Sequence, residues 1–571
     1  MDSIKELEMW KNSIAEEDLS ELESYDFDTL RDSFSKFVDF GTGGMRGLIG
    51  IGPNRINKYV VTRLSYALLE YLKSIGENQS PIVIIGYDCR VNSKDLALSV
   101  ARVLTDNGIR TTLFDADIIT PLLAYSVKTS SASLGIMITA SHNSKEYNGI
   151  KIYEKNGVQA TTDTTRKISY LYRNIENSKL FCIPELNEAF LDRNVLSIYN
   201  RYYTDVINSV NQFLHNKNSV KECFEGVNIT YSPLNGSAGR FVARVADLIG
   251  LSTIEYLKSE FEPDGLFPGL EAPNPELSSV YNKLILQATL NHSDLAICTD
   301  ADGDRLGIAV NHEGSFILLS GNQLAALITD YILSNYHSSD IRGKRIFKTV
   351  VTTRLVDAIA SDYNVSVTNT LTGFKNIGAA IDNLESEDDF LLGVEESAGY
   401  LINNYVLDKD GISALYLVLA MASEYKRQGK TLIDRLNTIY EKYGAYTDRQ
   451  NSLEIDERIR IKIDILRKKL TEGSIVVIGK DTIESVIDYE NLVKYNNNGD
   501  LIQMEPEFKT NLLIIELMSG SWIAIRPSGT EPKIKIYSEM VRRANISNNT
   551  DPTVGSMLAN ELLSLIEGCG D

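Results

Sequence analysis

Short apolar segments separated by helix-prone stretches recur in three groups along this chain, and this pattern constrains its fold more than any other feature. Each group contains three segments that are rich in β-branched residues, and a helix-like stretch follows the first of them. Strands that alternate with helices are typical of βαβ units in mixed, largely parallel sheets. The nine segments are 82–85, 111–114 and 134–138, then 227–231, 253–257 and 295–298, and finally 346–351, 365–368 and 390–392. The pattern predicts three consecutive α/β domains.

The last part of the chain differs, and it predicts a fourth domain of another type. After about Tyr446 the sequence contains a charged helix candidate, a turn and several short apolar segments, at 455–470, 475–478, 496–499, 512–518 and 522–525. A chain of 571 residues also exceeds the size of a single hydrophobic core. We therefore predict an α/β protein with three mixed-sheet domains and a C-terminal α+β domain around a central cleft. The predicted divisions are 1–205, 206–325, 326–445 and 446–571.

Composition and charge disfavour several classes of partner. The chain has 57 Lys and Arg against 77 Asp and Glu, so its formal net charge is −20. Nucleic acids and anionic membrane surfaces bind to cationic patches of proteins, so we expect neither as a partner of this acidic chain. No apolar run approaches the roughly 18–20 residues of a membrane span, and the first residues lack the pattern of a signal peptide. Five scattered cysteines are typical of a reducing compartment. We expect a cytoplasmic protein that is a monomer or a homodimer.

A polar loop follows the third segment of each group. These loops cover residues 139–143, 300–305 and 393–399. Open α/β sheets place their ligands at the carboxyl ends of their strands. The sequence therefore predicts that three domains present three loops to one cleft.

Three alternating aspartates in the second loop, Asp300, Asp302 and Asp304, are the strongest sign of chemistry. In an extended segment such residues point to one side, and three converging carboxylates repel one another unless a cation neutralises them. Oxygen ligands select Mg²⁺ or Ca²⁺. The calcium-binding helix-loop-helix pattern does not fit, because Arg305 and Asn311 occupy its glycine and glutamate positions. A magnesium site is the hypothesis, and a solvated acidic turn is the alternative.

Ser141 lies just after an apolar segment, with His142 beside it. A serine in this position is usually a turn or capping residue, and adjacent serine and histidine side chains are poorly placed for a hydrolase pair. A phosphorylated serine would carry a charge of about −1.5 to −2 and would complete a Mg²⁺ shell begun by the aspartates. Both the simple turn and the phosphoserine stay open at this point.

Two further loops carry groups that suit a sugar phosphate. Glu395 and Ser397 suit hydrogen bonds to neighbouring sugar hydroxyls, with an exposed acidic loop as the plain alternative. Near the end of the chain, a guanidinium, two hydroxyls and a flexible glycine follow a predicted strand: Arg526, Ser528, Gly529 and Thr530. These groups suit a phosphate site, although an ordinary Ser-Gly turn has the same composition.

In this order, the four motifs resemble those of the α-D-phosphohexomutases, the phosphoglucomutase and phosphomannomutase type, and the similarity runs from Gly41 to about Lys533. The resemblance implies a heart-shaped fold of four domains whose loops face one cleft. It implies that Ser141 is a phosphoserine that donates and recovers a phosphoryl group. The remaining roles that it implies are Mg²⁺ binding by Ser141, Asp300, Asp302 and Asp304, contact with the reacting region by Arg305, sugar-hydroxyl contacts by Glu395 and Ser397, and a distal phosphate site at Arg526, Ser528, Gly529, Thr530 and Lys533.

The resemblance extends to further residues. The segment 146–151 is similar to the one that contains the family's proposed general base, which implies this role for Lys151 and requires a lysine pKa lowered by burial or nearby cations. Two departures from the family pattern are Ser144, where many relatives have proline, and the sequence Gly-Val-Glu-Glu-Ser at 393–397. The other residues that the resemblance adds are His142 and Arg46 in the catalytic set, and Thr372, Gly373, Lys375, Lys348 and Lys409 in the substrate site.

The resemblance thus predicts a reversible transfer of a phosphoryl group between the 1- and 6-positions of a hexose phosphate, with glucose as the first choice. A bisphosphorylated sugar is the expected intermediate and activator, and one Mg²⁺ is the expected cofactor. Mannose and pentose phosphates are alternatives within the same family. A sugar phosphatase and a non-catalytic sugar-phosphate sensor are more remote ones. Small sugar phosphates are the expected partners in every case.

Overall fold

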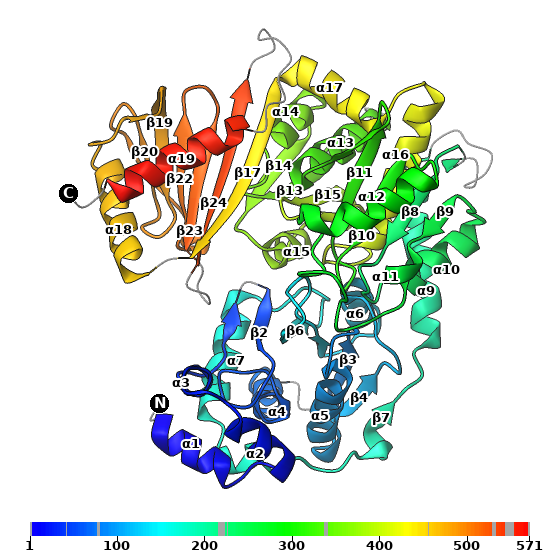
Figure 1. The fold of residues 1–571 in the computed structure, drawn as a ribbon, viewed down its shortest axis with the longest axis vertical. Helices are drawn as coiled ribbons and strands as arrows, with labels where there is room; N and C mark the ends of the chain where they lie inside the picture. Colours follow the sequence, from blue (N-terminus) through cyan, green and yellow to red (C-terminus); the bar gives the residue numbers. More distant parts are fainter. Residues whose placement is uncertain are drawn as a thin grey trace.

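The structure is a computed structural model. It describes residues 3–41, 43–76, 80–214, 223–224, 226–335, 341–454, 456–527, 533–542 and 553–568. Four regions follow one another along the chain and in space, from the blue and cyan first region to the orange and red last one (Figure 1). Each region contains one main sheet, and we number these regions domains 1 to 4.

Domain 1 has a seven-stranded sheet in the order β1-β2-β6-β5-β3-β4-β7. Its longest helix, α4, follows Asn57, whose side chain accepts a hydrogen bond from the Val60 backbone N–H and so caps the helix. The strands are β1 (Phe40–Gly41), β2 (Gly44–Leu48), β3 (Ile82–Tyr87), β4 (Arg110–Leu113), β5 (Leu134–Ile138), β6 (Tyr147–Glu154) and β7 (Leu191–Asp192). The helices are α1 (Ser3–Lys11), α2 (Glu16–Glu23), α3 (Phe27–Ser33), α4 (Lys58–Ser74), α5 (Ser93–Asp106), α6 (Thr120–Thr129), α7 (Thr162–Asn174), α8 (Asn177–Leu180) and η1 (Glu188–Phe190).

Domain 2 has a five-stranded sheet in the order β12-β11-β10-β8-β9. All five residues of β10 are buried, as expected for a central strand that is covered on both faces. The strands are β8 (Ile229–Ser232), β9 (Ile254–Tyr256), β10 (Leu295–Thr299), β11 (Leu306–His312) and β12 (Ser315–Leu318). The helices are α9 (Leu196–Asn211), α10 (Gly239–Ile249), α11 (Lys258–Phe261), η3 (Ser278–Val280) and α12 (Tyr281–Leu290).

Domain 3 has a four-stranded sheet in the order β14-β13-β15-β16. Its helix α16 is buried on nearly all sides, which explains the apolar run 414–422. The strands are β13 (Arg345–Thr349), β14 (Ser366–Thr370), β15 (Phe390–Glu395) and β16 (Gly399–Leu401). The helices are α13 (Gly321–Asn335), α14 (Leu355–Asp362), α15 (Phe374–Asp382), η4 (Glu387–Asp389), α16 (Gly411–Arg427) and α17 (Leu432–Tyr443).

Domain 4 has a sheet in the order β17-β24-β23-β22-β19-β20-β21, with β18 paired to β19. Its neighbouring strands are antiparallel, and two helices, α18 and α19, pack with it around a separate core. The strands are β17 (Ala445–Glu454), β18 (Val477–Ile478), β19 (Asp481–Asp488), β20 (Val493–Asn496), β21 (Leu501–Gln503), β22 (Leu513–Leu517), β23 (Trp522–Pro527) and β24 (Lys533–Arg542). The helices are α18 (Glu457–Thr471), η5 (Pro506–Phe508) and α19 (Thr553–Glu567).

Domains 1, 2 and 3 share one arrangement of four strands. A central strand (β3, β8 or β13) lies between two parallel neighbours. A fourth strand (β6, β11 or β16) runs antiparallel to one of these neighbours. The loop that joins the third strand to the fourth therefore occupies the same position in each domain. These three loops are the polar loops that the sequence singled out.

The predicted fold class is confirmed, with small differences at the element ends. All nine predicted segments contain a strand of domains 1 to 3. Strand β15 continues to Glu395, so this residue ends a strand where we expected a loop. The predicted boundaries at 205 and 325 fall inside α9 and α13, and β17 begins at residue 445. Across the described ranges, no helix has the length and apolar content needed to cross a bilayer.

Candidate functional site

The equivalent loops of domains 1, 2 and 3 contact one another. The Ser141 hydroxyl of domain 1 donates to Asp300 Oδ2 of domain 2 at 2.8 Å. Domain 3 joins through a bridge between Arg305 and Gly399 and through a hydrogen bond from the Gly411 N–H to the Gly303 carbonyl, at 3.2 Å. The repeated topology thus brings three loops from distant parts of the sequence to one place.

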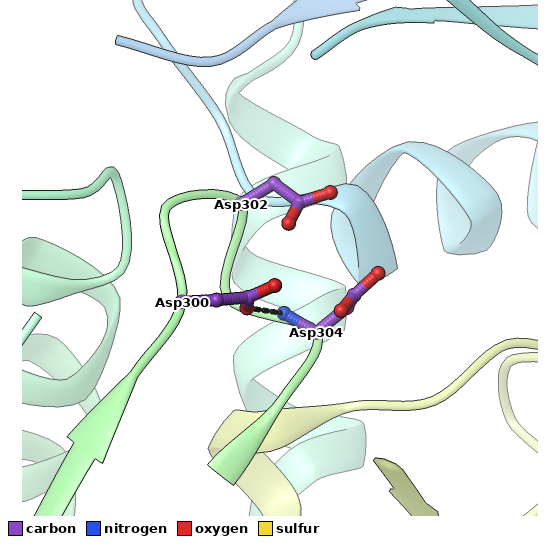
Figure 2. A group of neighbouring side chains, drawn as sticks. All are labelled: Asp300, Asp302 and Asp304. Carbon is purple, nitrogen blue, oxygen red and sulfur yellow. Dashed lines mark hydrogen bonds between the residues drawn. The ribbon is translucent and has the colours of Figure 1, made fainter. Parts of the chain in front are cut away.

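The three aspartates form a buried cluster at the centre of this contact. Asp300, Asp302 and Asp304 have no exposed surface, and one oxygen from each lies within 4.8 Å of the other two. Figure 2 shows them around the turn between β10 and β11, with the dashed line marking the bond from the Asp304 N–H to Asp300 Oδ1 (3.0 Å). The Arg305 N–H donates to the same oxygen. The turn therefore fixes Asp300 with its own backbone.

Two ammonium groups face the other two aspartates. Lys151 Nζ lies 2.7 Å from Asp302 Oδ2 and 2.9 Å from Asp304 Oδ2, and Lys409 Nζ lies 3.1 Å from Asp304 Oδ2. Burial raises the pKa of Asp300 well above its usual range, and the neighbouring carboxylates add to the rise. Burial acts in the same direction on Asp302 and Asp304, but the ammonium groups outweigh it and lower the pKa of both. Two of the three carboxyls are therefore held as anions.

The charge state of Lys151 differs from the expectation for a general base. Burial by itself lowers the pKa of the Lys151 ammonium, but Asp302 and Asp304 outweigh burial and raise it. In this arrangement the carboxylates therefore favour the protonated form of Lys151, and its role as a general base stays a prediction. The reason is that Lys151 is an ion-pair partner of the same aspartates that the sequence assigned to a metal.

The cluster has the donor set and the free oxygens that a hard cation requires. Within the part of the chain that the structure describes, the buried oxygens Asp302 Oδ1 and Asp304 Oδ1 have no hydrogen-bond partner. A buried acceptor without a partner is costly, and carboxylate oxygens are the preferred ligands of Mg²⁺. The residues present therefore fit a magnesium ion.

Ser141 is held in an unusual backbone conformation. Its φ is +53°, in the left-handed region that residues with a side chain rarely adopt. The Ser141 N–H donates to the Thr139 hydroxyl at 2.7 Å, and its own hydroxyl lies 3.3 Å from His142 Nδ1. Burial and nearby cations, first Arg305 and then Arg46, keep the pKa of His142 well below its usual range. His142 is thus a neutral neighbour of the Ser141 hydroxyl.

Two predicted arginines lie around the serine. Arg46 Nη1 donates to Asn143 Oδ1 at 2.8 Å, inside the serine loop. Arg305 Nη1 pairs with Glu276 at 2.7 Å, and its Nε lies 4.0 Å from Asp300 Oδ2. Burial lowers the pKa of Arg305, but Glu276 and the aspartates outweigh it and raise it. Burial lowers the pKa of Arg46, but a guanidinium stays protonated in proteins. Both groups therefore stand near the Ser141 loop as cations.

Three of the predicted sugar-binding residues lie together, and a fourth lies apart from them. The Ser397 hydroxyl donates to Glu395 Oε1 at 3.0 Å, and Lys409 Nζ lies 3.7 Å from the same oxygen. These three residues are continuous with the aspartate cluster through Lys409. The structure does not bring Lys348 to this group, because its ammonium contacts the Thr352 carbonyl and Asp357, each at 3.1 Å.

Three predicted substrate-site residues, Thr372, Gly373 and Lys375, lie at the start of helix α15. Gly373 is the residue before the helix and has a φ of +101°, which a glycine adopts without strain. Thr372 and Lys375 flank it, and both are buried. Burial lowers the pKa of Lys375, and Arg526 of domain 4 lowers it further. The loop therefore lies close enough to domain 4 for the two cations to interact.

The predicted phosphate site of domain 4 is described only in part. Arg526 is the last residue but one of strand β23, and Lys533 begins strand β24. Ser528, Gly529 and Thr530 lie outside the described residues. Lys535, two residues after Lys533, is partly buried, and this burial lowers its pKa, as does the nearby Arg305. Domain 4 thus directs cations toward the same centre as the other domains.

Sequence reasoning missed several residues of this site. Thr120 donates its hydroxyl to Asp302 Oδ2 at 2.6 Å, Glu276 pairs with Arg305, and Arg90 binds the carbonyls of the serine loop. The alternation Lys533-Ile-Lys535-Ile would have indicated a strand with both lysines on one face. No comparable local pattern marks Thr120 or Glu276, since their partners lie more than 25 positions away.

The loops of domains 1 and 2 thus bring a serine hydroxyl and three buried carboxylates together, and the equivalent loop of domain 3 lies beside them. Models of three α/β/α domains of phosphoglucomutase/phosphomannomutase match the chain, domain I at residues 38–179, domain II at 200–314 and domain III at 320–443. The chain belongs to the phosphoglucomutase/phosphomannomutase family.

Individual relatives agree with this assignment. A phosphoglucomutase from Staphylococcus haemolyticus is 32% identical over 513 residues, which are 88% of this chain and 90% of the relative. The structure of a candidate phosphomannomutase from Thermus thermophilus has a TM-score of 0.69 at 20% identity, over 93% of this chain and all of that one. The structure of the Paramecium phosphoglucomutase parafusin has a TM-score of 0.66 at 18% identity, over 93% of this chain and 94% of that one. The chain is thus a phosphohexose mutase by sequence, and its fold is that of these solved structures.

Proposed function

We propose that this enzyme interconverts the 1-phosphate and the 6-phosphate of a hexose, with glucose as the preferred sugar, through a phosphoserine at Ser141. The observation that carries the proposal is the 2.8 Å contact between the buried Ser141 hydroxyl and Asp300, inside a cluster of carboxylates and cations. Phosphorylated Ser141 donates its phosphoryl group to the free hydroxyl of the substrate. The bisphosphorylated sugar then turns around, and its other phosphoryl group returns to Ser141. The sequence similarity to phosphoglucomutases supports glucose.

In this proposal, Asp300, Asp302 and Asp304 hold a magnesium ion together with the phosphate on Ser141. The two carboxylate oxygens without partners, one each on Asp302 and Asp304, support this assignment. When bound, Mg²⁺ supplies charge stabilisation for the transferring phosphoryl group. Arg305 and Arg46 add fixed positive charge on the Ser141 side. Phosphoryl transfer depends mainly on positioning and on such electrostatic stabilisation.

Lys151 is our first choice for the group that takes the proton of the attacking hydroxyl. In the structure its ammonium is paired with Asp302 and Asp304, which favours the protonated form. It acts as a base only where its contact with one of these carboxylates is broken. His142, which is held neutral and lies 3.3 Å from the Ser141 hydroxyl, is the other candidate for proton transfer.

The substrate itself would be held from two sides. Glu395 and Ser397 form hydrogen bonds with its hydroxyls, and Lys409 lies beside them. Further contacts with the substrate come from the start of α15, at Thr372, Gly373 and Lys375. Arg526, Ser528, Gly529, Thr530 and Lys533 hold the phosphate that does not react. This division suits a sugar that binds in two orientations, because the domain 4 site binds a phosphate while the other residues bind the hydroxyls of the sugar ring.

The proposal is tested by replacing the nucleophile. We expect Ser141→Ala to lower mutase kcat/KM for glucose 1-phosphate by more than about 10⁴-fold, with glucose 1,6-bisphosphate supplied, because the covalent route is lost. Ser144→Ala in the same loop is the matched control and keeps near wild-type turnover. Near wild-type turnover of Ser141→Ala would refute the phosphoserine. Phosphorus NMR of the wild-type reaction adds a second readout, since orthophosphate without glucose 6-phosphate would show a phosphatase.

Sugar preference is tested separately. We expect kcat/KM to be highest for glucose 1-phosphate in a panel that also contains mannose, ribose and N-acetylglucosamine phosphates. A higher value for any other sugar would overturn the preference for glucose and leave the phosphoserine mechanism intact.

A further inference from the structure

Behind the Ser141 loop, a buried arginine contacts several backbone carbonyls of that loop. Arg90 follows the central strand β3, and its side chain has no exposed surface. Its Nη2 donates to the Ser141 carbonyl at 2.5 Å and to the Asn143 carbonyl. Its Nη1 donates to the carbonyls of Ser144 and Tyr147, at 2.8 and 3.1 Å. One guanidinium thus ties together four peptide groups of residues 141–147.

A carboxylate completes this contact from the other side. Asp88 Oδ2 accepts the Thr139 hydroxyl at 2.6 Å, and the same hydroxyl oxygen accepts the Ser141 N–H at 2.7 Å. Asp88 Oδ2 also lies 3.3 Å from Arg90 Nε. The peptide groups before and after Ser141 are therefore both fixed, one through Thr139 and one through Arg90.

These hydrogen bonds hold Ser141 in a backbone conformation that is unfavourable by itself. Ser141 has a φ of +53°, and a non-glycine residue persists in this region only when its surroundings hold it there. The planar guanidinium, with five N–H donors in a fixed fork, suits this task better than a lysine ammonium does. Without these bonds, the favoured conformations of Ser141 would turn its hydroxyl away from Asp300.

Domain 2 covers the outer side of Arg90. The Phe267 ring lies 4.9 Å from the guanidinium carbon, and Gly265 forms a backbone bridge with Arg90. A Cβ at Gly265 would lie 2.6 Å from the Cys89 carbonyl oxygen, so the two backbones approach as closely as glycine allows. The segment of domain 2 therefore shields the guanidinium from water, which strengthens its hydrogen bonds.

We propose that Arg90, supported by Asp88 and covered by Phe267, is a positioning residue that sets the direction of the Ser141 hydroxyl. This inference rests on the proposed function, because it gives Arg90 a role in phosphoryl transfer through Ser141. It assigns no contact with substrate to Arg90. Its consequence is that loss of the four carbonyl contacts slows the chemical step and leaves sugar binding nearly unchanged.

The test is Arg90→Lys, which keeps the charge beside Asp88 and removes the fork. We expect kcat to fall by about 100-fold and KM to change by less than about twofold, since a small displacement of a reacting group costs about this much. Hydrogen exchange of the peptide that covers 139–147 becomes faster, measured by mass spectrometry. Arg240→Lys is the matched control, because Arg240 also donates to a domain 1 carbonyl, that of Asp117, from domain 2. It keeps wild-type kcat and wild-type exchange in 139–147.

A second variant covers the case in which Arg90→Lys does not fold. Thr139→Val keeps the shape of the side chain and removes the hydroxyl between Asp88 and the Ser141 N–H, so we expect the same fall in kcat at constant KM. Wild-type kcat in the folded variants, or a rise in KM alone, would overturn the positioning role. Absence of mutase activity in the wild-type enzyme would overturn the proposed function. Exchange in 139–147 would then still decide whether Arg90 orders the loop.

Discussion

Two pairs of carboxylates at domain contacts of this enzyme differ in their partners. At the contact of domains 1, 2 and 3, Asp302 and Asp304 face the ammonium groups of Lys151 and Lys409. At the contact of domains 3 and 4, Asp448 accepts the Ser320 hydroxyl and the Asn322 amide, at 2.8 and 3.0 Å. Glu539 accepts the Arg354 backbone N–H and the Trp522 indole N–H, at 3.0 and 2.9 Å. Charged ammonium groups donate to Asp302 and Asp304, whereas neutral groups donate to Asp448 and Glu539.

The pKa values of the two pairs move in opposite directions as a result. Burial raises the pKa of Asp448 and Glu539, and their neutral donors do not reverse this rise. Burial has the same effect on Asp302 and Asp304, but ammonium groups lower the net pKa of both. The comparison teaches that burial alone does not mark a carboxylate as functional. A pair that is kept anionic suits a cation, while the other pair joins two domains. Free oxygens alone do not separate the pairs, because Glu539 Oε1 also lacks a hydrogen-bond partner among the described residues.

The largest difference between the two places is expected in catalysis. Asp302→Asn removes an anionic ligand atom and should lower kcat/KM by about 100- to 1000-fold, the size of effect found when one charge-stabilising group is lost. Asp448→Asn is the matched variant and should change kcat/KM little, because an amide still bonds to Ser320 and Asn322. Initial rates at saturating Mg²⁺ measure both. Equal losses in the two variants would remove the functional distinction.

A smaller difference is expected in stabilisation by metal. Mg²⁺ that binds the folded enzyme stabilises it by about 2.7 kcal/mol at a free concentration of 100 times Kd. We expect Mg²⁺ to raise the Tm of the wild type and of Asp448→Asn but not that of Asp304→Asn. Differential scanning calorimetry with Mg²⁺ or with EDTA measures the shift. An unchanged shift in Asp304→Asn would place the ion elsewhere.

The smallest difference concerns pH. Folding raises the pKa of Glu539, so the folded state binds this proton more tightly than the unfolded state does. The contribution of Glu539 to stability is therefore full below its unfolded pKa of about 4.3 and is lost as the pH rises through its folded pKa, at about 1.4 kcal/mol for each pH unit between the two values. Glu539→Gln removes this loss, so its Tm relative to wild type should increase from pH 5 to 7.5.

The exposed Glu484 of strand β19 provides the control for this pH effect. The Tm of Glu484→Gln relative to wild type should not vary over the same pH range. A Tm difference for Glu539→Gln that stays constant from pH 5 to 7.5 would show that Glu539 is charged in the folded protein throughout, contrary to the account.

The sequence alone predicted much of the fold because domains 1 to 3 place apolar strands between helices. It missed β17, whose sequence AYTDRQNSLE has no apolar pattern and becomes a strand through its pairing with β24. It also missed β24, although its alternation of lysine and isoleucine is a strand signal. Tertiary pairing decides the first case, and the second was available from periodicity.

The candidate site was predictable to the extent that its residues form local motifs. The alternation of Asp300, Asp302 and Asp304 is visible in the sequence, and the structure gathers these residues into one cluster. The pairing of Lys151 with that cluster is not visible, because the two segments lie about 150 positions apart. The role of Arg90 is not visible either. Its side chain donates to backbone carbonyls, which every residue type has, so the sequence does not identify its partners.

The central claim is that Ser141 carries the phosphoryl group between the two positions of the sugar. The most direct measurement incubates the enzyme and Mg²⁺ with glucose 1,6-bisphosphate that bears a labelled phosphate, and then locates the label by peptide mass spectrometry. We expect one labelled phosphate on Ser141, which passes to added glucose 1-phosphate or 6-phosphate at a rate at least equal to turnover. Label on His142 or another residue, or an active enzyme without labelled Ser141, would contradict the account.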